Sequence, residues 1–241
     1  SIFLALKAIN IQCGDEVIVP NITFPATANA VKLAGAKVIL ADVDKQNLLI
    51  DINDIKKKIT EKTKAIIPVH ISGRGCNLKE IIKIAKSKKI HVIEDAAEAF
   101  ASKQNGKCLG TFGDLGCFSF APNKIITTGQ GGIIITNKKK LFISLKKLKD
   151  QGRTKVNPEG EDSYQSLGYN FKFTDMQAAL GLAQIQELKE RIKILKKNYN
   201  IYKEELRDLK NFKIILFNIS KGEVPLWIDA HFDNRKSLFF F

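Results

Sequence analysis

The sequence lacks any run of about 18 consecutive apolar residues, the length that a membrane-spanning helix needs. Its beginning, from Ser1 to Lys7, is too short and becomes charged too early for a secretory signal. There is no initiator Met, and the sequence ends on Phe239–Phe241. We therefore expect no membrane partner, and we interpret both ends of the 241-residue chain as truncated.

Cysteine is scarce, and its spacing excludes the usual metal and disulfide frameworks. The four cysteines form no Cys-x-x-Cys pair, and the three histidines are not spaced with them as zinc ligands. These seven residues are Cys13, Cys76, Cys108, Cys117, His70, His91 and His231. We predict no metal site and expect reduced thiols in a cytoplasmic protein.

Arginine is rare for so basic a chain. Lys and Arg number 39 against 25 Asp and Glu, a formal net charge of +14, yet only five of the basic residues are Arg. Nucleic-acid-binding proteins favour Arg and cluster their charge, whereas here Lys is spread along stretches such as 56–58 and 138–140. This pattern favours a solvated surface and no nucleic-acid partner. A patch for a polyanion or an acidic ligand remains the alternative.

What is present is a globular composition with alternating strand and helix patterns. Hydrophobic residues make up 44% and charged residues 27%, which excludes a disordered or fibrous chain. Short β-branched runs predict strands at 16–20, 36–40, 64–70 and 90–94, and helices at 26–33, 51–59 and 78–86, with Asp51 as an N-cap. The fold class is α/β, a mostly parallel sheet flanked by helices.

The second half of the chain no longer shows the regular alternation of strands and helices. It predicts strands at 116–120 and 132–136, a helix at 141–148 and a polar loop at 151–169. Thr174 then opens a long helix that runs, with a break, to about Leu209, before two strands at 212–217 and 224–230. We predict a large cofactor-binding domain over residues 1–190, and a long helix with the beginning of a small C-terminal domain over residues 191–241.

The first candidate for chemistry is Asp95, in the run Glu94-Asp95-Ala96-Ala97-Glu98. It lies at the carboxyl end of a predicted buried strand, where open α/β sheets bind their ligands. A carboxylate there can pair with a cationic group of a ligand. Asp also serves as a helix N-cap, and this motif alone does not separate the two interpretations.

The second candidate is Lys124, which stands between a strand and a turn rich in Thr and Gly. Judged alone it is a surface lysine in a lysine-rich chain. However, a desolvated Lys can form a Schiff base, and Ser and Thr hydroxyls with Gly N–H groups suit a phosphate. Together with Asp95 and Ser119, Lys124 completes the set of residues that pyridoxal phosphate requires. We therefore predict pyridoxal 5′-phosphate as the cofactor.

Ordered blocks along nearly the whole chain resemble the DegT/DnrJ/StrS family of pyridoxal-phosphate-dependent sugar aminotransferases. The blocks are residues 14–20, 23–31, 68–70, 94–99, 113–114, 118–120, Lys124 with 127–129, 168–172 and 177–179. The resemblance implies the fold-type I, aspartate-aminotransferase-like architecture. It also implies a small α+β domain that continues beyond Phe241, and a Gly-Thr turn before Ser1 that helps hold the phosphate.

The resemblance implies a role for each matching residue. Lys124 would be the Schiff-base lysine and the proton shuttle, and Asp95 would keep the ring nitrogen of the cofactor protonated. Phe24 would stack on the ring, and Ser119 would bind the phosphate. Asn170 would reach the phosphate of the neighbouring subunit, which makes the active site a property of a homodimer. Without the resemblance, Phe24 is an ordinary core aromatic and Asn170 a polar residue before a helix.

Two sites depart from the family pattern, and one further position matches it without a clear role. Gln130 stands where Glu is commoner in the family, and Gln151-Gly152 where His-Gly is commoner. We interpret both as variation near the site. His70 also matches a family position, and we expect it to be a packed core residue.

The implied function is amination of a keto group on a nucleotide-linked deoxysugar, with glutamate as the amino donor, in surface-polysaccharide or secondary-metabolite biosynthesis. A sugar dehydratase of the same family is one alternative, but there a His replaces the Lys, so Lys124 argues against it. A non-catalytic basic binding or regulatory protein is the other, and an inactive fragment a third. The sequence does not predict the sugar, the nucleotide or the carbon that is aminated.

Overall fold

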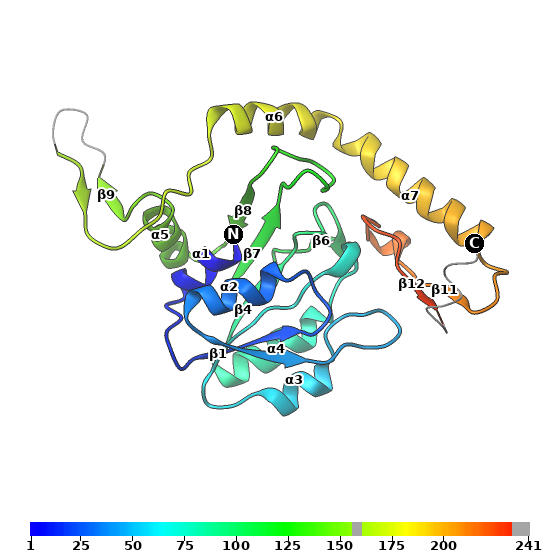
Figure 1. The fold of residues 1–241 in the computed structure, drawn as a ribbon, viewed down its shortest axis with the longest axis horizontal. Helices are drawn as coiled ribbons and strands as arrows, with labels where there is room; N and C mark the ends of the chain where they lie inside the picture. The colour runs from blue at the N-terminus through cyan, green and yellow to red at the C-terminus, as the bar shows by residue number, and fades with distance from the viewer. Residues whose placement is uncertain (156–160, 233–241) are drawn as a thin grey trace.

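The computed structural model describes residues 1–155 and 161–232. Part of the predicted 151–169 loop, residues 156–160, lies outside the described residues, and so does the end of the predicted small domain, residues 233–241. The fold is built around one six-stranded sheet with the strand order β2-β1-β3-β4-β7-β8 (Figure 1). Its strands are β1 (Glu16–Pro20), β2 (Lys37–Ala41), β3 (Thr63–Ile66), β4 (His91–Asp95), β7 (Leu115–Ser119) and β8 (Gly132–Ile135). The first five in this order run parallel, and β8 pairs antiparallel with β7.

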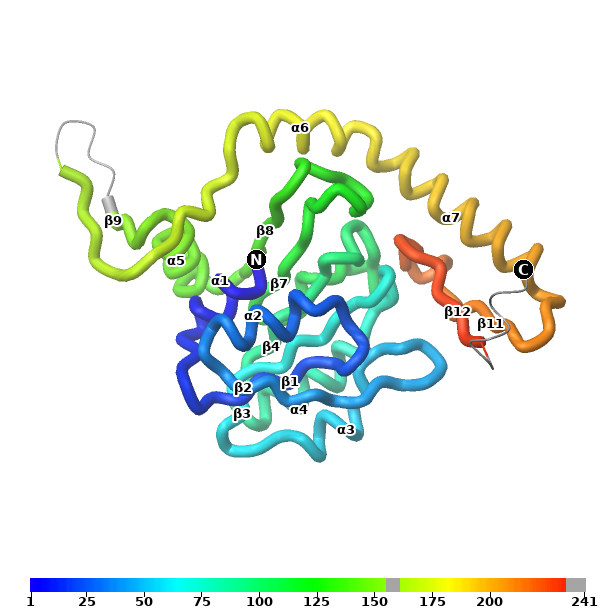
Figure 2. The backbone as a smooth tube through the Cα atoms, in the orientation of Figure 1, coloured from blue at the N-terminus to red at the C-terminus, as the bar shows by residue number. Residues whose placement is uncertain are grey.

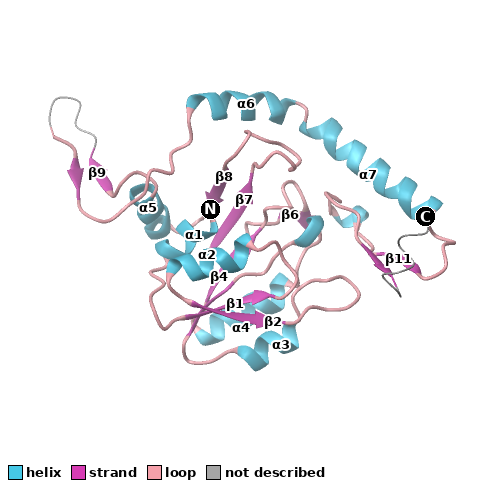
Figure 3. Cartoon of the chain, viewed as in Figure 1, coloured by secondary structure: helices cyan, strands magenta, loops and turns pink. Residues whose placement is uncertain are grey.

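Helices cover both faces of the sheet, as the predicted α/β class requires (Figure 3). All five residues of β1 are buried, and their side chains alternate between the faces. Val17 and Val19 pack in one core cluster and Ile18 in the other. The first cluster takes residues from α1 (Ile2–Ala8), α2 (Ala26–Ala34) and α5 (Lys139–Leu148), and the second from α3 (Ile52–Lys58) and α4 (Leu78–Lys88).

Asp51 caps α3 as predicted. Its carboxylate accepts hydrogen bonds from the N–H groups of Asn53 at 2.6 Å and Asp54 at 3.0 Å. The predicted strand at 64–70 is too long, because β3 ends at Ile66. Pro68 lacks the N–H that would continue the ladder, and beyond it only Val69 pairs, in an isolated bridge to Asp95.

The predicted long helix is two helices that form an arm, which we define as α6 (Asp175–Gln186) and α7 (Leu188–Glu205), with the expected break between them. Figure 2 shows the arm running over the turn between β7 and β8 and on to the C-terminal strands. Helix α6 has no buried residue. Met176 is 83% exposed and Leu180 is 42% exposed, so this chain does not bury the apolar positions of α6.

The predicted strand at 224–230 is wrong. Strand β12 is Ala230–Phe232, and it pairs antiparallel with β11 (Phe212–Ile214), which is shorter than the predicted 212–217 strand. The backbone before β12 bonds to the body of the molecule instead. The Val224 N–H donates to Ser102 Oγ at 2.9 Å, and the Leu226 N–H donates to the Ser72 carbonyl at 2.9 Å.

Short elements complete the chain. The segment predicted as a loop contains a small antiparallel pair, formed by β9 (Arg153–Lys155) and β10 (Ser163–Tyr164). The remaining elements are β5 (Lys103–Gln104), β6 (Lys107–Cys108) and the 3₁₀ turns Ile71–Gly73 and Ile219–Lys221. No helix in the two described ranges has both the length and the hydrophobicity needed to cross a bilayer.

Candidate active site

A cavity of about 580 Å³ opens where β4 and β7 end, and four of the five predicted site residues line it: Phe24, Asp95, Ser119 and Lys124. Parallel strands place their carboxyl ends at the same edge of a sheet. Asp95 is the last residue of β4 and Ser119 the last of β7. Residues far apart in sequence therefore meet at this edge.

Asp95 is buried, with 5% of its surface exposed. Its Oδ2 accepts a hydrogen bond from Thr27 Oγ1 at 2.7 Å, and its Oδ1 accepts one from the Ala97 N–H at 3.2 Å. Burial raises the pKa of Asp95, and these two hydrogen bonds oppose that rise. Turns rather than a helix follow it over residues 96–102, so the helix N-cap interpretation is wrong.

Lys124 faces the cavity from the turn after β7, and its side chain is only 12% exposed. It is therefore not an ordinary surface lysine. Its Nζ lies 3.4 Å from Oε1 of Glu98. The other oxygen of that carboxylate accepts a hydrogen bond from the Ser72 N–H at 2.7 Å. Glu98 is thus fixed from one side and presents its charge to the amine from the other.

Phe24 and Ser119 occupy the wall of the same cavity. Phe24 is 75% exposed, so it is not the core aromatic that the sequence without the resemblance would suggest. Ser119 Oγ accepts a hydrogen bond from the Ala121 N–H at 3.3 Å. Gln130 also lines the cavity, and its carbonyl accepts a hydrogen bond from Gln177 Nε2 at 2.8 Å, which ties the turn after β7 to α6.

Asn170, the fifth predicted site residue, does not line the cavity of its own chain. It is exposed, it bridges to Asp150 ahead of α6, and its Oδ1 accepts a hydrogen bond from Lys172 Nζ at 2.9 Å.

We assigned no role from the sequence to Thr27 and Glu98, which contact Asp95 and Lys124 respectively. Both lie in blocks that match the family. Thr27 follows Thr23 by four residues, but Thr23 lies in the loop before α2, so the contact between the two hydroxyls depends on the conformation of that loop. Glu98 follows Asp95 by three residues in irregular backbone, so its approach to Lys124 depends on the tertiary fold.

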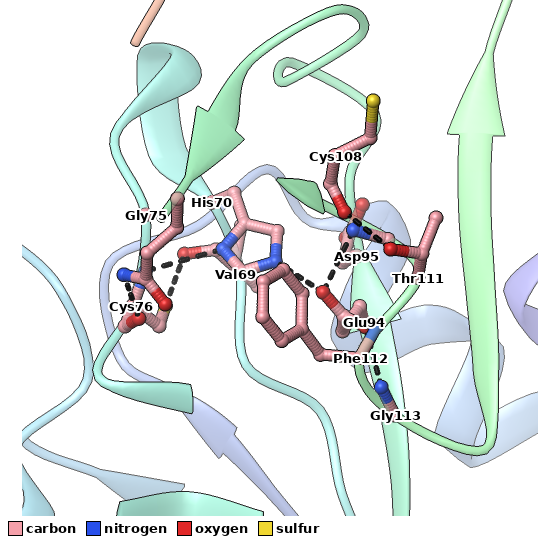
Figure 4. Close-up of polar contacts among 12 residues, drawn as sticks. Val69, His70, Gly75, Cys76, Glu94, Asp95, Cys108, Thr111, Phe112 and Gly113 are labelled. Atoms are coloured by element: carbon pink, nitrogen blue, oxygen red, sulfur yellow. Dashed lines mark hydrogen bonds and ion pairs between the residues drawn. The ribbon is translucent and has the colours of Figure 1, made fainter. Parts of the chain in front are cut away.

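A buried polar cluster supports β4 from the opposite face (Figure 4). Strand alternation directs Glu94 away from Asp95. The Glu94 carboxylate contacts His70 Nε2 at 2.9 Å and accepts hydrogen bonds from the N–H groups of Gly110 at 2.7 Å and of Phe112 and Gly113 at 2.6 Å. Burial raises the pKa of Glu94, but the hydrogen bonds from His70 and from backbone N–H groups lower it by more. The pKa of Glu94 is therefore lowered.

His70 is fully buried, which confirms the prediction of a packed core histidine. Its Nδ1 accepts a hydrogen bond from the Cys76 N–H at 3.2 Å, which assigns the ring proton to Nε2, facing Glu94. Its backbone N–H donates to the Asp95 carbonyl at 3.0 Å. The cluster thereby fixes the backbone that carries Asp95.

The fold and the residues of the cavity together indicate the class of protein to which this chain belongs. The sequence model of the DegT/DnrJ/EryC1/StrS aminotransferase family matches residues 1–238, and the chain belongs to this family. A GDP-perosamine synthase of Escherichia coli O157:H7 is 44% identical over 209 residues, which cover 87% of this chain and 57% of that protein. The chain thus spans little more than half the length of this curated relative.

Two solved structures show the same fold. The aminotransferase TlmJ from Streptoalloteichus hindustanus superposes with a TM-score of 0.92 at 26% identity, covering 98% of this chain and 65% of that one. A GDP-4-keto-6-deoxymannose-3-dehydratase (ColD) mutant with bound GDP-perosamine gives a TM-score of 0.89 at 27% identity, covering 99% of this chain and 68% of that one.

Family membership supports pyridoxal 5′-phosphate as the cofactor, and the residues of the cavity fit it. The cavity offers a buried carboxylate, an amine, a hydroxyl and an exposed aromatic ring. These groups match a cationic ring nitrogen, a carbonyl carbon, a phosphate and a ring face. Among the described residues, no group of three or more His, Cys, Asp or Glu side chains gathers to hold a metal ion.

Proposed function

We propose that the protein to which this chain belongs is a pyridoxal-phosphate-dependent aminotransferase that converts a nucleotide-linked keto sugar into the amino sugar. The observation that carries the proposal is the meeting of Asp95 and Lys124 at one cavity. Each is mostly buried, at 5% residue exposure and 12% side-chain exposure. A chain that used the fold only for packing has no need of a carboxylate and an amine held there out of water.

Bound pyridoxal phosphate supplies a carbonyl carbon that takes up an amino group and a ring that withdraws electrons. Asp95 would stay ionised opposite the ring nitrogen. An ionised carboxylate with so little water around it is stabilised most by a cation, so this pairing is favourable for both groups.

Lys124 would hold the cofactor through its Nζ and then move a proton to and from the substrate carbon, a general acid–base role. Its short turn, with the Lys124 N–H donating to the Ala121 carbonyl at 3.1 Å, leaves the side chain free to change partner from Glu98. Phe24 would cover the ring and exclude water, which its exposed position permits. Ser119 would donate its hydroxyl to the phosphate.

The substrate class rests on the relatives. Because the relative from E. coli is described as a GDP-perosamine synthase, a GDP-linked keto sugar is the first substrate to assay. Glutamate is the proposed amino donor. Four unpaired cysteines suit a reducing compartment, and we place the reaction in the cytoplasm.

The proposal includes a homodimer with shared active sites. Asn170 lies outside the cavity of its own chain, and α6, which follows it, leaves Met176 83% and Leu182 67% exposed. An apolar helix in water favours a partner, and a second copy would carry Asn170 toward the first copy's cavity. We also propose the division into a large domain, residues 1–190, and the beginning of a small one, residues 191–241, which includes most of α7. Tyr199, Ile214 and Phe217 form a hydrophobic cluster separate from the sheet.

The dehydratase alternative remains within the same fold, as the resemblance to the 3-dehydratase structure shows. The cavity of this chain presents Lys124 where that alternative requires a histidine. The described histidines do not line it.

The test is borohydride reduction of the full-length protein with pyridoxal phosphate, followed by peptide mapping. We expect the reduced cofactor on Lys124 alone, and no incorporation in Lys124→Ala. Lys138→Ala is the control, because Lys138 also pairs with a carboxylate, Asp114, but lies outside the cavity. Label on another lysine would overturn the assignment.

A further inference from the structure

A chain of two hydroxyl groups leads from the cavity to Asp95. Thr23 Oγ1 lies 2.9 Å from Thr27 Oγ1, and Thr27 Oγ1 lies 2.7 Å from Asp95 Oδ2. Thr27 is 1% exposed, in the first turn of α2, while Thr23 is part-buried in the preceding loop, and both line the cavity. These contacts link α2 to the end of β4.

The direction of each hydrogen bond follows from counting protons. An ionised carboxylate only accepts, and a threonine hydroxyl carries one proton. Thr27 therefore donates to Asp95 and must accept from Thr23. Both bonds run toward the carboxylate, so the hydroxyl of Thr27 is polarised by Thr23 while it stabilises the charge of Asp95.

The other groups around Asp95 do not replace this contact. Burial raises the pKa of Asp95; the Thr27 hydroxyl lowers it most, then the Ala97 N–H, while Glu98 raises it. On the neighbouring strand β7, burial raises the pKa of Cys117 to about 12, so this thiol is neutral and brings no charge. Thr27 is thus the main side chain that opposes the effect of burial.

We propose that Thr27 is a positioning residue for Asp95. Its hydroxyl fixes the orientation of the carboxylate and keeps it ionised before the ring nitrogen arrives, and Thr23 supports it from the cavity side. The role of Thr27 toward the cofactor rests on the proposed function, whereas the contact between Thr27 and Asp95 does not. The two levels are therefore tested separately.

The first experiment uses the full-length protein without cofactor. Carbon-13 NMR of labelled Asp carboxyls, with Asp95 assigned by Asp95→Asn, follows its titration in three variants. Thr27→Val keeps the shape and removes the hydroxyl, and we expect the midpoint to rise by about one pH unit. Thr27→Ser keeps the hydroxyl and should titrate like the wild type. Thr23→Val should give a smaller rise. An unchanged midpoint in Thr27→Val overturns the proposal.

The second experiment adds pyridoxal phosphate and records its absorption spectrum against pH. We expect the Kd for the cofactor to weaken about tenfold in Thr27→Val, with a shifted pH profile of the absorption band, and to be restored in Thr27→Ser. If Thr27→Val binds the cofactor like the wild type, the positioning role is overturned. If even the wild type fails to bind it while the carboxyl titration still shifts, the proposed function fails and the Thr27–Asp95 contact stands.

Should Thr27→Val fail to fold, Thr27→Ser and Thr23→Val decide the matter in the same measurements. A wild-type-like midpoint in Thr27→Ser with a raised one in Thr23→Val supports the hydroxyl chain. A raised midpoint in Thr27→Ser that equals the rise in Thr23→Val contradicts it, because the hydroxyl of serine should suffice.

Discussion

The body of the molecule, which we define as the sheet and helices α1–α5, and the arm use similar apolar residues in opposite ways. In the body, residues such as Val17, Ile66 and Ile93 have no exposed surface. In the arm, α6 buries none of its residues, and Leu182 is 67% exposed. The body therefore buries a core within one chain, although it also leaves Leu33 and Phe142 exposed, whereas α6 contributes no buried residue at all.

The difference extends to the candidate site. Asp95, Lys124 and Ser119 come from the body and meet without help from any other chain. Asn170 lies exposed just before the arm. One chain thus brings the three residues of the candidate centre together, while α6 and Asn170 stay outside that centre, as the proposed homodimer requires.

The largest expected effect tests whether the arm carries Asn170 to another chain. In the full-length protein, Lys124→Ala removes the proposed general acid–base group, which should lower turnover by at least about 10²–10⁴-fold. Asn170→Ala should inactivate the partner's site by weakening cofactor phosphate binding. Mixing the two inactive proteins should restore activity to about a quarter of the wild type, since half of the dimers are mixed and each has one intact site.

The control for this mixture is Lys124→Ala with Lys124→Ala carrying a different affinity tag. Tag exchange proves that mixed dimers form, and activity should stay at the level of the parent variant. If mixed dimers of the two different variants form and remain inactive, the site is built within one chain, and the contrast between body and arm has no catalytic meaning.

Asp95→Asn should separate activity from stability within the body. Turnover of the full-length enzyme should fall by about 10²-fold or more, because the ring nitrogen would lose its proposed charged partner. Burial raises the pKa of Asp95 in the folded state, so the cofactor-free protein loses stability as pH rises through that pKa. At pH 7 the asparagine protein should therefore melt about 2–4 °C higher than the wild type.

Calorimetry against pH checks this second part. The difference in melting temperature should vanish below the ordinary pKa of Asp, about 3.9, where both side chains are neutral. A cofactor-free asparagine protein that melts lower at pH 7 would mean that the charge of Asp95 stabilises the fold.

A matched pair of truncations sharpens the comparison between core and arm. Ile93→Ala removes a fully buried side chain from β4 and should lower the free energy of unfolding by about 2–5 kcal/mol. Leu182→Ala on α6 should change it by less than about 0.5 kcal/mol in the monomer. Urea unfolding measures both. Sedimentation should show weaker self-association for Leu182→Ala only, and equal effects on unfolding would contradict the contrast.

Glu94→Gln should lower the free energy of unfolding, measured by urea unfolding, by about 2–3 kcal/mol. The reason is that an amide NH₂ then faces a backbone N–H donor that needs an acceptor. The folded-state pKa of Glu94 is lowered, so its contribution is present above the ordinary Glu pKa and disappears as pH falls through the lowered value. The difference in the free energy of unfolding between wild type and Glu94→Gln should decrease steadily below about pH 4. A gap that stays constant down to pH 2 would show that the charge is unimportant.

Much of the secondary structure of the body could be predicted from local sequence patterns, because each apolar run or capping residue forms its element mainly through nearby residues. The apolar run 16–20 is β1, and Asp51 caps α3 as its position predicts. The errors arise where long-range bonds decide. Strand β3 stops before Pro68, and the Val224 N–H bonds to Ser102 rather than to a neighbouring strand.

The candidate site divides in the same way. Asp95 and Ser119 could be placed together because both end parallel strands. Lys124 needed its combination with Asp95 and Ser119, since a lone lysine in a lysine-rich chain carries little signal. The contacts of Thr27 with Asp95 and of Glu98 with Lys124 could not be predicted, because each joins segments whose distance only the fold determines.

The segment from Gly222 to Leu226 has a consequence for the order of events during synthesis. Val224 and Leu226 line a small cavity with Glu98 and Lys124, and the Leu226 N–H bonds to Ser72. The ribosome completes β4 and β7 about a hundred residues before this wall emerges, which takes roughly 5–20 seconds at typical elongation rates. We therefore expect the side chain of Lys124 to stay open to water until the segment from Gly222 to Leu226 has been made and has packed against it.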